Sequence, residues 1–306
     1  MNIYIKDTPV TPKVKNKYNL PKCIVRAVKN DTYEKGPSDI STTTLIKPPR
    51  ITQLEHRYAH DIEEDVSDLV FSLLGQSVHH VIERAALNSD IVEKRIFYNG
   101  PETNGWNLSG QIDLLQSDGS LVDFKVTSAW TAMDAMQNNK TEWEQQLNVY
   151  DFIASNNDLY PVESLSIMAI LRDWSKLRVM QSDSYPRKQA IMIPIRKWSR
   201  EEQSNFIKQR IQLHQESCKQ DANKLPICTP AERWSKPDTF AVMKKGRKKA
   251  VRVLDTRLLA EKYLEQNNLV DGKDAVIVHR VGEDVRCEHY CSVNRFCNYY
   301  KEGVKF

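Results

Sequence analysis

The chain of 306 residues contains no long hydrophobic run. No stretch approaches the roughly 18 consecutive apolar residues of a membrane-spanning helix, so we expect no membrane span. Residues 1–11 hold no apolar segment of the length that a secretory signal needs, which predicts a cytoplasmic protein. In that reducing compartment the six cysteines are not expected to pair as disulfides.

Charge of one sign is in small excess. The formal net charge is +4, which suits a polyanionic partner but does not identify one. The sequence also has no internal repeat, no low-complexity tract, no helicase-type phosphate loop and no helix that resembles a major-groove reader. The absence of a helicase-type phosphate loop argues against autonomous DNA unwinding. The absence of a major-groove reading helix argues against cutting at a specific base sequence.

Three regions follow from the hydrophobic pattern. Residues 1–41 read as a polar, irregular arm, and residues 42–225 as an α/β core in which helices flank a mixed β-sheet. The core pattern predicts helices within 42–88, 141–155 and 200–218, and strands at 91–98, 106–115, 121–126, 165–172 and 191–195. Residues 226–306 read as a small basic module of βαβ type, with strands at 250–254 and 275–281 around a helix at 256–266.

A hairpin in the core concentrates charge. Two apolar runs flank Asp118-Gly119, and Asp-Gly between such runs is a strong hairpin signal. The hairpin brings together Asp113, Asp123 and Lys125. Like charges a few Å apart destabilise each other unless a cation neutralises them, which favours a divalent metal.

Polar pairs at helical spacing lie on either side of this hairpin. His79 and Glu83 are four residues apart in the preceding helix, and Gln146 and Tyr150 repeat that spacing in the next one. Residues at i and i+4 share a helix face, so each pair can reach the same site.

In order and type these residues resemble the PD-(D/E)XK nuclease superfamily, in its RecB-like branch, which includes CRISPR-associated exonucleases and many phage exonucleases. The branch carries a Gly-x-x-x-His helix, a Gly-x-x-Asp strand, an Asp-x-Lys strand and a Gln-x-x-x-Tyr helix. They match Gly75 to His79, Gly110 to Asp113, Asp123 to Lys125 and Gln146 to Tyr150. The resemblance implies a restriction-endonuclease-like fold and a phage or prophage source.

The resemblance also implies a metal-dependent DNA nuclease, most simply an exonuclease on DNA ends or single strands in recombination, repair or replication. Mg²⁺ or Mn²⁺ would be held by His79, Asp113, Asp123 and the backbone carbonyl of Phe124. Lys125 would position the attacking water or stabilise charge on the scissile phosphate. Gln146 and Tyr150 would orient the DNA strand or the lysine, and Glu83 would hold His79 from behind.

Alternatives stay open for several of these residues. Asp113 and Lys125 could form a cross-strand ion pair, Glu83 could pair with Arg84 or Arg95, and Tyr150 could be a core residue. His80 could replace His79 as the ligand. At the level of function, the rivals are a structure-selective or site-specific endonuclease, and a non-catalytic DNA-binding or assembly protein that retains the fold. Recombination or replication proteins are possible partners.

The cysteines near the end of the chain have metal-ligand spacing. Cys287, Cys291 and Cys297 supply three thiolates, and Cys228 is favoured over Cys23 as the fourth. The resemblance favours a [4Fe–4S] cluster. Zinc, with four cysteines or with His289 as one ligand, and free buried thiols are the alternatives.

A basic run offers a further DNA contact. Five cations surround Gly246, namely Lys244, Lys245, Arg247, Lys248 and Lys249, and they could follow phosphates or simply form a solvated face. Five of the six tryptophans, at 130, 143, 174, 198 and 234, could stack on unpaired bases or lie in the core.

Overall fold

The computed structural model describes residues 13–29 and 36–303. Residues 1–222 and residues 223–306 form two compact units. The sequence pattern had put the corresponding change at residue 226. Of the helices in the described ranges, none combines the length and apolar character that crossing a membrane requires.

A mixed β-sheet organises the first unit. In the described ranges it has six strands in the order β2-β5-β6-β7-β8, with β4 also paired to β5. The strands are β2 (Ile40–Ser41), β4 (Ile91–Tyr98), β5 (Leu108–Leu115), β6 (Ser120–Thr127), β7 (Ser164–Leu171) and β8 (Ala190–Ile195). The pairs β2/β5 and β6/β7 are parallel and the others antiparallel. The expectation of an α/β fold with a mixed sheet is confirmed.

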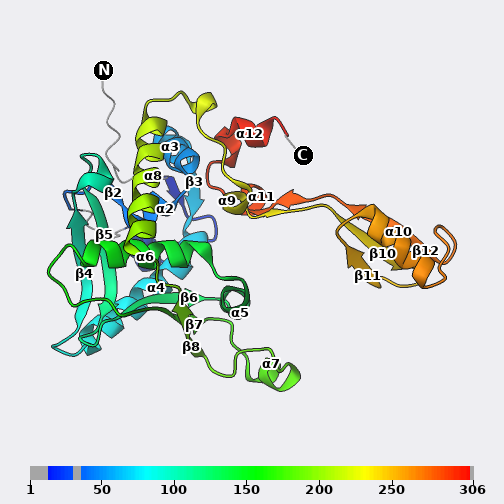
Figure 1. Cartoon of the computed structure of the whole chain (residues 1–306), viewed down its shortest axis with the longest axis horizontal. Coiled ribbons are helices and arrows are strands. Elements are labelled where there is room, and N and C mark those ends of the chain that lie inside the picture. Colours follow the sequence, from blue (N-terminus) through cyan, green and yellow to red (C-terminus); the bar gives the residue numbers. More distant parts are fainter. Residues whose placement is uncertain (1–12, 30–35, 304–306) are drawn as a thin grey trace. The chain divides into compact units, whose positions relative to one another are not determined.

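The first unit also contains helices, some of which cover the sheet (Figure 1). They are α1 (Lys22–Lys29), α2 (Thr42–Ile46), α3 (Pro49–Arg57), α4 (Val66–Ala85), α5 (Ala129–Asn138), α6 (Thr141–Ala154), α7 (Lys176–Gln181) and α8 (Arg200–Cys218). The region expected to be an irregular arm includes α1 and strand β1 (Lys13–Lys15), which pairs in parallel with β3 (Glu63–Asp65). The sequence pattern did not predict α1, α5, β1 or β3.

Opposite faces of β6 meet different helices. Phe124 contacts α4 through an edge-on packing of its ring against His79, with ring centroids 5.8 Å apart. The flanking Asp123 accepts a hydrogen bond from Gln146 of α6. Because neighbouring side chains on a strand point to opposite faces, α4 and α6 lie on opposite sides of the sheet.

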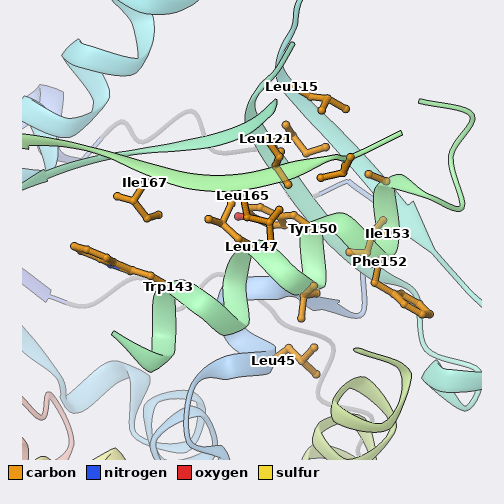
Figure 2. Close-up of a cluster of buried hydrophobic side chains, with 14 of the residues drawn as sticks. Leu45, Leu115, Leu121, Trp143, Leu147, Tyr150, Phe152, Ile153, Leu165 and Ile167 are labelled. Carbon is orange, nitrogen blue, oxygen red and sulfur yellow. The ribbon is translucent and has the colours of Figure 1, made fainter. Parts of the chain in front are cut away.

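The main core forms between α6 and the sheet. Figure 2 shows Leu147, Tyr150 and Ile153 of α6 directed toward side chains of the sheet, among them Leu115, Leu121, Leu165 and Ile167. The alternating burial of β7, in which every second residue is buried, follows from one strand face lying against α6. This packing fixes the helix that carries the Gln-x-x-x-Tyr pair.

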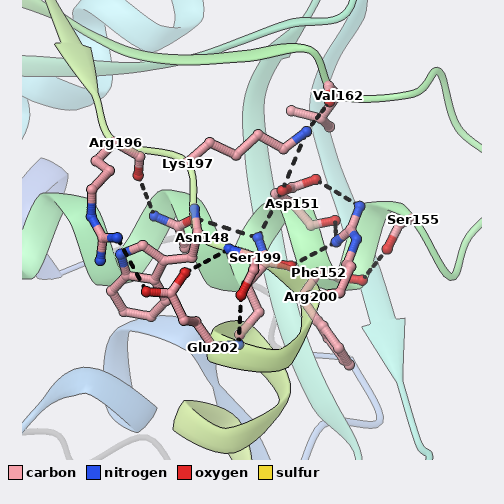
Figure 3. A network of polar contacts seen from close by, with 12 residues as sticks. Asn148, Asp151, Phe152, Ser155, Val162, Arg196, Lys197, Ser199, Arg200 and Glu202 are labelled. Carbon is pink, nitrogen blue, oxygen red and sulfur yellow. Dashed lines mark hydrogen bonds and ion pairs between the residues drawn. The ribbon is translucent and has the colours of Figure 1, made fainter.

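A buried polar network ties α6 to α8. Asp151 of α6 is fully buried and accepts hydrogen bonds from Arg200 at 3.1 Å and from Gln203 at 2.7 Å (Figure 3). Asn148, one turn earlier, donates to the carbonyl oxygen of Arg196 and accepts from the backbone N–H of Trp198. A buried carboxylate needs such partners, so the network fixes the position of α8 along α6.

The second unit contains a small antiparallel sheet in the order β11-β10-β12. Its strands are β10 (Thr239–Lys244), β11 (Arg252–Leu254) and β12 (Ala275–Arg280), and α10 (Arg257–Gln266) packs on it through Ala260 and Leu264. The unit also contains α9 (Pro230–Arg233), β9 (Ser235–Lys236), β13 (Glu283–Asp284), α11 (Val285–His289) and α12 (Asn298–Lys301).

The expected βαβ connection of this module is present. Strands β11 and β12 both run antiparallel to β10 and so run parallel to each other, with α10 between them in the sequence and β10 between them in the sheet. The strand that the sequence pattern missed is β10, which comes before the basic run. Residues 245–251 therefore form the connection of a β10/β11 hairpin, which holds most of the basic run, with Gly246 in the left-handed region at φ 82°.

Candidate metal and catalytic site

The site lies where β5 and β6 separate. These strands pair at Leu114–Val122 and Leu115–Leu121, next to a turn in which Gly119 takes φ 85°. Beyond those pairs, Asp113 bridges the two strands by accepting a hydrogen bond of 2.8 Å from the backbone N–H of Phe124. The predicted hairpin is thus present, and it brings Asp113 beside the Asp123-x-Lys125 segment.

His79 reaches the site from α4. Its Nε2 lies 3.8 Å from Oδ2 of Asp113, and its Nδ1 donates a hydrogen bond of 2.7 Å to Oε1 of Glu93. That bond raises the pKa of His79. Because Nδ1 carries the proton for Glu93, the lone pair of Nε2 is free to face Asp113.

Glu93 is the residue that sequence reasoning missed. It lies on β4, where Val92 is opposite Leu114 and Lys94 opposite Ile112, so that Glu93 lies across from Asp113. Its backbone takes φ 47°, a strained conformation for a non-glycine residue. Burial opposes ionisation of Glu93, but hydrogen bonds from His79 and Gln111 outweigh it and keep its pKa below the usual range.

Glu83 does not play the part expected of it. Its carboxylate lies 3.7 Å from Nδ1 of His80, on the exposed side of α4, and Glu93 instead takes the position behind His79. The i, i+4 spacing allowed Glu83 and His79 to share a helix face. That spacing could not show that Glu93, from strand β4, would bind the imidazole of His79 in the folded protein.

Asp123 is 1% exposed and bound from two sides. Its Oδ1 accepts a hydrogen bond of 3.0 Å from Gln146, and its Oδ2 lies 2.7 Å from Nζ of Lys125. That ion pair lacks hydrogen-bond geometry, so Oδ2 is a buried oxygen with no hydrogen-bond donor. A cation beside it would complete its coordination.

Gln146 and Tyr150 are buried, and the group of the site that Gln146 contacts is Asp123. Nε2 of Gln146 is placed to donate to Asp123 and to the hydroxyl of Tyr150, at 3.0 and 2.9 Å. The Tyr150 ring packs against Gly110, where an added Cβ would lie 2.7 Å from Cδ1 of the ring. Two of the sequence motifs are therefore in direct contact, and Gln146 and Tyr150 position Asp123.

The donor set fits a divalent cation. Ligand atoms of His79, Glu93 and Asp113 all lie within 4.8 Å of one another. Both oxygens of Glu93 already accept hydrogen bonds, so we assign it to positioning and assign His79, Asp113 and the adjacent Asp123 to metal binding. Burial, followed by repulsion from Asp123, raises the pKa of Asp113 to about 7, a destabilisation that a bound cation would relieve.

The second unit brings four cysteines into one neighbourhood. Burial raises the pKa of Cys228 to about 12, with further contributions from Glu232 and from the thiols of Cys287, Cys291 and Cys297. Burial likewise raises the pKa of Cys287 to about 11. His289 is exposed, and Cys23 is an exposed residue of α1 in the first unit.

Comparison with known proteins adds little. No family model matches the sequence, and no curated protein matches it. One similar solved structure, described as "Crystal structure of SSO0001", is 16% identical, covers 63% of this chain and 83% of that chain, and has a TM-score of 0.41. Similarity at this level does not establish a shared fold or function.

Proposed function

We propose that the chain is a metal-dependent DNA nuclease of the PD-(D/E)XK, RecB-like type, with a restriction-endonuclease-like core, acting as an exonuclease on DNA ends or single strands. The observation that carries the proposal is the convergence of His79, Asp113 and Asp123 beside Lys125, with Oδ2 of Asp123 lacking a hydrogen-bond donor. A bound Mg²⁺ or Mn²⁺ would supply positive charge to a phosphate oxygen and acidify a water.

Side chains of the protein would position the metal ligands and stabilise the reacting phosphate. Glu93 holds the imidazole of His79 so that Nε2 faces the ligand position, and Gln146 holds the carboxylate of Asp123. Lys125, whose ammonium group lies at the edge of the site, positions the water or stabilises the negative charge that develops on the phosphate. Together the metal, the residues that position its ligands and Lys125 would supply the groups needed for phosphodiester hydrolysis.

The test uses linear DNA labelled at the 5′ or 3′ end, a closed circle, and Mn²⁺. We expect metal-dependent loss of linear DNA, at least a thousandfold slower in Asp123→Asn, and full activity in Asp118→Asn, whose carboxylate caps the hairpin turn. Cutting of the closed circle would instead show an endonuclease. No metal-dependent cleavage, or cleavage that survives Asp123→Asn, would contradict the proposed site.

For the second unit we propose a structural [4Fe–4S] cluster held by Cys228, Cys287, Cys291 and Cys297. The support is that the thiols of Cys287, Cys291 and Cys297 lie close enough to Cys228 to raise its pKa. Four cysteine thiolates are the usual ligands of such a cluster.

Metal analysis of the purified protein tests the cluster. We expect iron and visible absorbance that disappear in Cys228→Ser and persist in Cys23→Ser. Stoichiometric zinc in a colourless protein would overturn the assignment.

The exposed cations at 244–249 are proposed to contact the DNA backbone. Their replacement by glutamine would test this proposal, because binding should then depend less on salt concentration.

A further inference from the structure

The tryptophans differ sharply in their surroundings. Trp143 is buried in the core, and the indole N–H groups of Trp174 and Trp198 donate to the carbonyl of Pro186 and the carboxylate of Glu144. Trp234, in the second unit, packs against Tyr290 and Arg286. Trp130 is 72% exposed, the most exposed tryptophan in the chain. A large apolar ring held in solvent is costly, so its surroundings are informative.

The backbone around Trp130 is fixed although its ring is exposed. Strands β6 and β7 are parallel and end together, with Thr127 opposite Leu171. The N–H of Arg172 then donates to the carbonyl of Thr127 at 2.9 Å, and the N–H of Ala129 donates to Asp173 at 2.7 Å. Trp130 therefore stands on the first turn of α5, anchored to the end of β7.

A second exposed ring is connected to the same strand ends. Phe71 of α4 is 59% exposed, and the guanidinium carbon of Arg172 lies 4.4 Å from its ring centroid. Arg172 thus joins Phe71 to the strand ends that support Trp130. Aromatic faces and a guanidinium plane are the surfaces on which proteins stack unpaired bases, and the guanidinium also attracts phosphate.

Both elements lead to the metal site. On α4, Phe71, Gly75 and His79 follow one another at i, i+4 and i+8, so they form one stripe about 12 Å long. Nothing lies within 4 Å of where a Cβ on Gly75 would be, which leaves the middle of the stripe open. On β6, Lys125 is two residues before Thr127. A strand of nucleic acid can therefore run from the catalytic groups to the two rings.

We propose that Phe71, Trp130 and Arg172 form a stacking subsite for unpaired bases of single-stranded DNA next to the scissile phosphate. This inference rests on the proposed nuclease function and narrows its substrate class. In a duplex each base is already stacked and paired, so its face is not available to a side chain. The subsite therefore selects single strands and frayed ends without reading base identity.

Binding measured in EDTA tests the subsite separately from cleavage. We expect Trp130→Ala and Phe71→Ala each to weaken binding of labelled oligothymidylate about tenfold, within the range of one lost base stack. Trp130→Phe should retain most of the affinity. Met136→Ala removes another exposed apolar side chain, 59% exposed, from the helix that carries Trp130, and we expect no change in binding. Binding of a relaxed, covalently closed duplex circle, which has neither ends nor unpaired loops, should be unaffected by every variant.

An abasic oligonucleotide provides the second arm. Because it offers no base faces to either ring, wild-type protein should bind it more weakly than Trp130→Ala, which retains Phe71, binds the normal strand. Trp130→Ala should cause no further loss on the abasic strand. Equal losses on the duplex, on the abasic strand and on the normal strand would overturn the stacking subsite and indicate a protein-contact surface instead.

The failures of the two proposals are distinguishable. If the wild-type protein cleaves DNA and the Phe71 and Trp130 variants bind single strands normally, the stacking subsite is wrong and the nuclease function stands. Selective loss of single-strand binding in those variants, in a wild type that never cleaves with Mn²⁺, supports the subsite and removes the catalytic assignment.

Discussion

Nδ1 of His79, on α4, lies 2.7 Å from Oε1 of Glu93, on β4, and this contact turns Nε2 toward Asp113. Gln111 donates to the other oxygen of Glu93 and in turn accepts from Arg95 at 2.7 Å. The imidazole is thus held by a chain of hydrogen bonds that begins on the sheet. Such support behind a metal-binding histidine fixes both its orientation and its tautomer.

Replacing Glu93 with asparagine should weaken Mn²⁺ binding about 10- to 100-fold, because the shorter side chain cannot reach His79. Asparagine tolerates the positive φ of this position, so the backbone should not be strained further. Isothermal titration measures the affinity. Glu83→Asn is the matched control and should bind Mn²⁺ as wild type does, since Glu83 faces His80. Equal affinity in both variants would show that Glu93 does not position the ligand.

Replacement of Gly75 and of Gly110 by alanine should change the free energy of unfolding in opposite directions. A Cβ on Gly110 would lie 2.7 Å from the buried Tyr150 ring, so Gly110→Ala should cost about 1–3 kcal/mol of unfolding free energy. Gly75 is in the interior of α4 with open space around it, so Gly75→Ala should add about 0.5–1 kcal/mol. Urea denaturation of the two variants compares them. Destabilisation of similar size at both positions would contradict the packing of Tyr150 on Gly110.

Only part of the fold and of the candidate site could be predicted from the sequence. The hairpin was predictable because its turn and its apolar runs are local, and the spacing of Gln146 and Tyr150 correctly placed them on one helix face. Their contacts were not predictable, because Gly110 and Tyr150, like His79 and Glu93, come together only when separate elements pack. Strand β10 was missed for a related reason: its sequence, Thr-Phe-Ala-Val-Met-Lys, is a short apolar run whose strand character depends on β12 beside it.

His214 makes the stability of the first unit depend on pH. Burial lowers its pKa to about 4, with Arg210 acting in the same direction, from 6.5 in the unfolded chain. Between these values the unfolded state binds a proton that the folded state does not. Stability should therefore fall as pH drops from 6.5 to about 4, by up to about 3 kcal/mol, and this contribution should not change below pH 4.

The comparison that isolates this effect is His214→Gln, which retains a side-chain donor for the carbonyl of Leu45, the partner of Nε2 at 3.1 Å. Urea denaturation at several pH values should show a shallower loss of stability in the variant than in wild type between pH 6.5 and 4. Parallel curves for the two proteins would mean that other groups cause the acid sensitivity.

Two aspartates on the first unit separate buried from exposed ion pairing. Asp151 is fully buried and accepts hydrogen bonds from Arg200 and Gln203, whereas Asp183 pairs with Arg187 on the surface, four residues away. Asp151→Ala leaves the buried Gln203 amide with only its longer contact of 3.3 Å to Asn148, removes the partner of Arg200 and opens a cavity between α6 and α8, so we expect a loss of about 2–4 kcal/mol. Asp183→Ala should cost less than about 0.5 kcal/mol, as isolated surface pairs do. Because α6 also carries Gln146, loosening it should slow cleavage by the folded Asp151→Ala protein, whereas the Asp183→Ala protein should cleave at the wild-type rate. Comparable losses of stability from the two variants would show that the α6–α8 network does not hold the helix that positions Asp123.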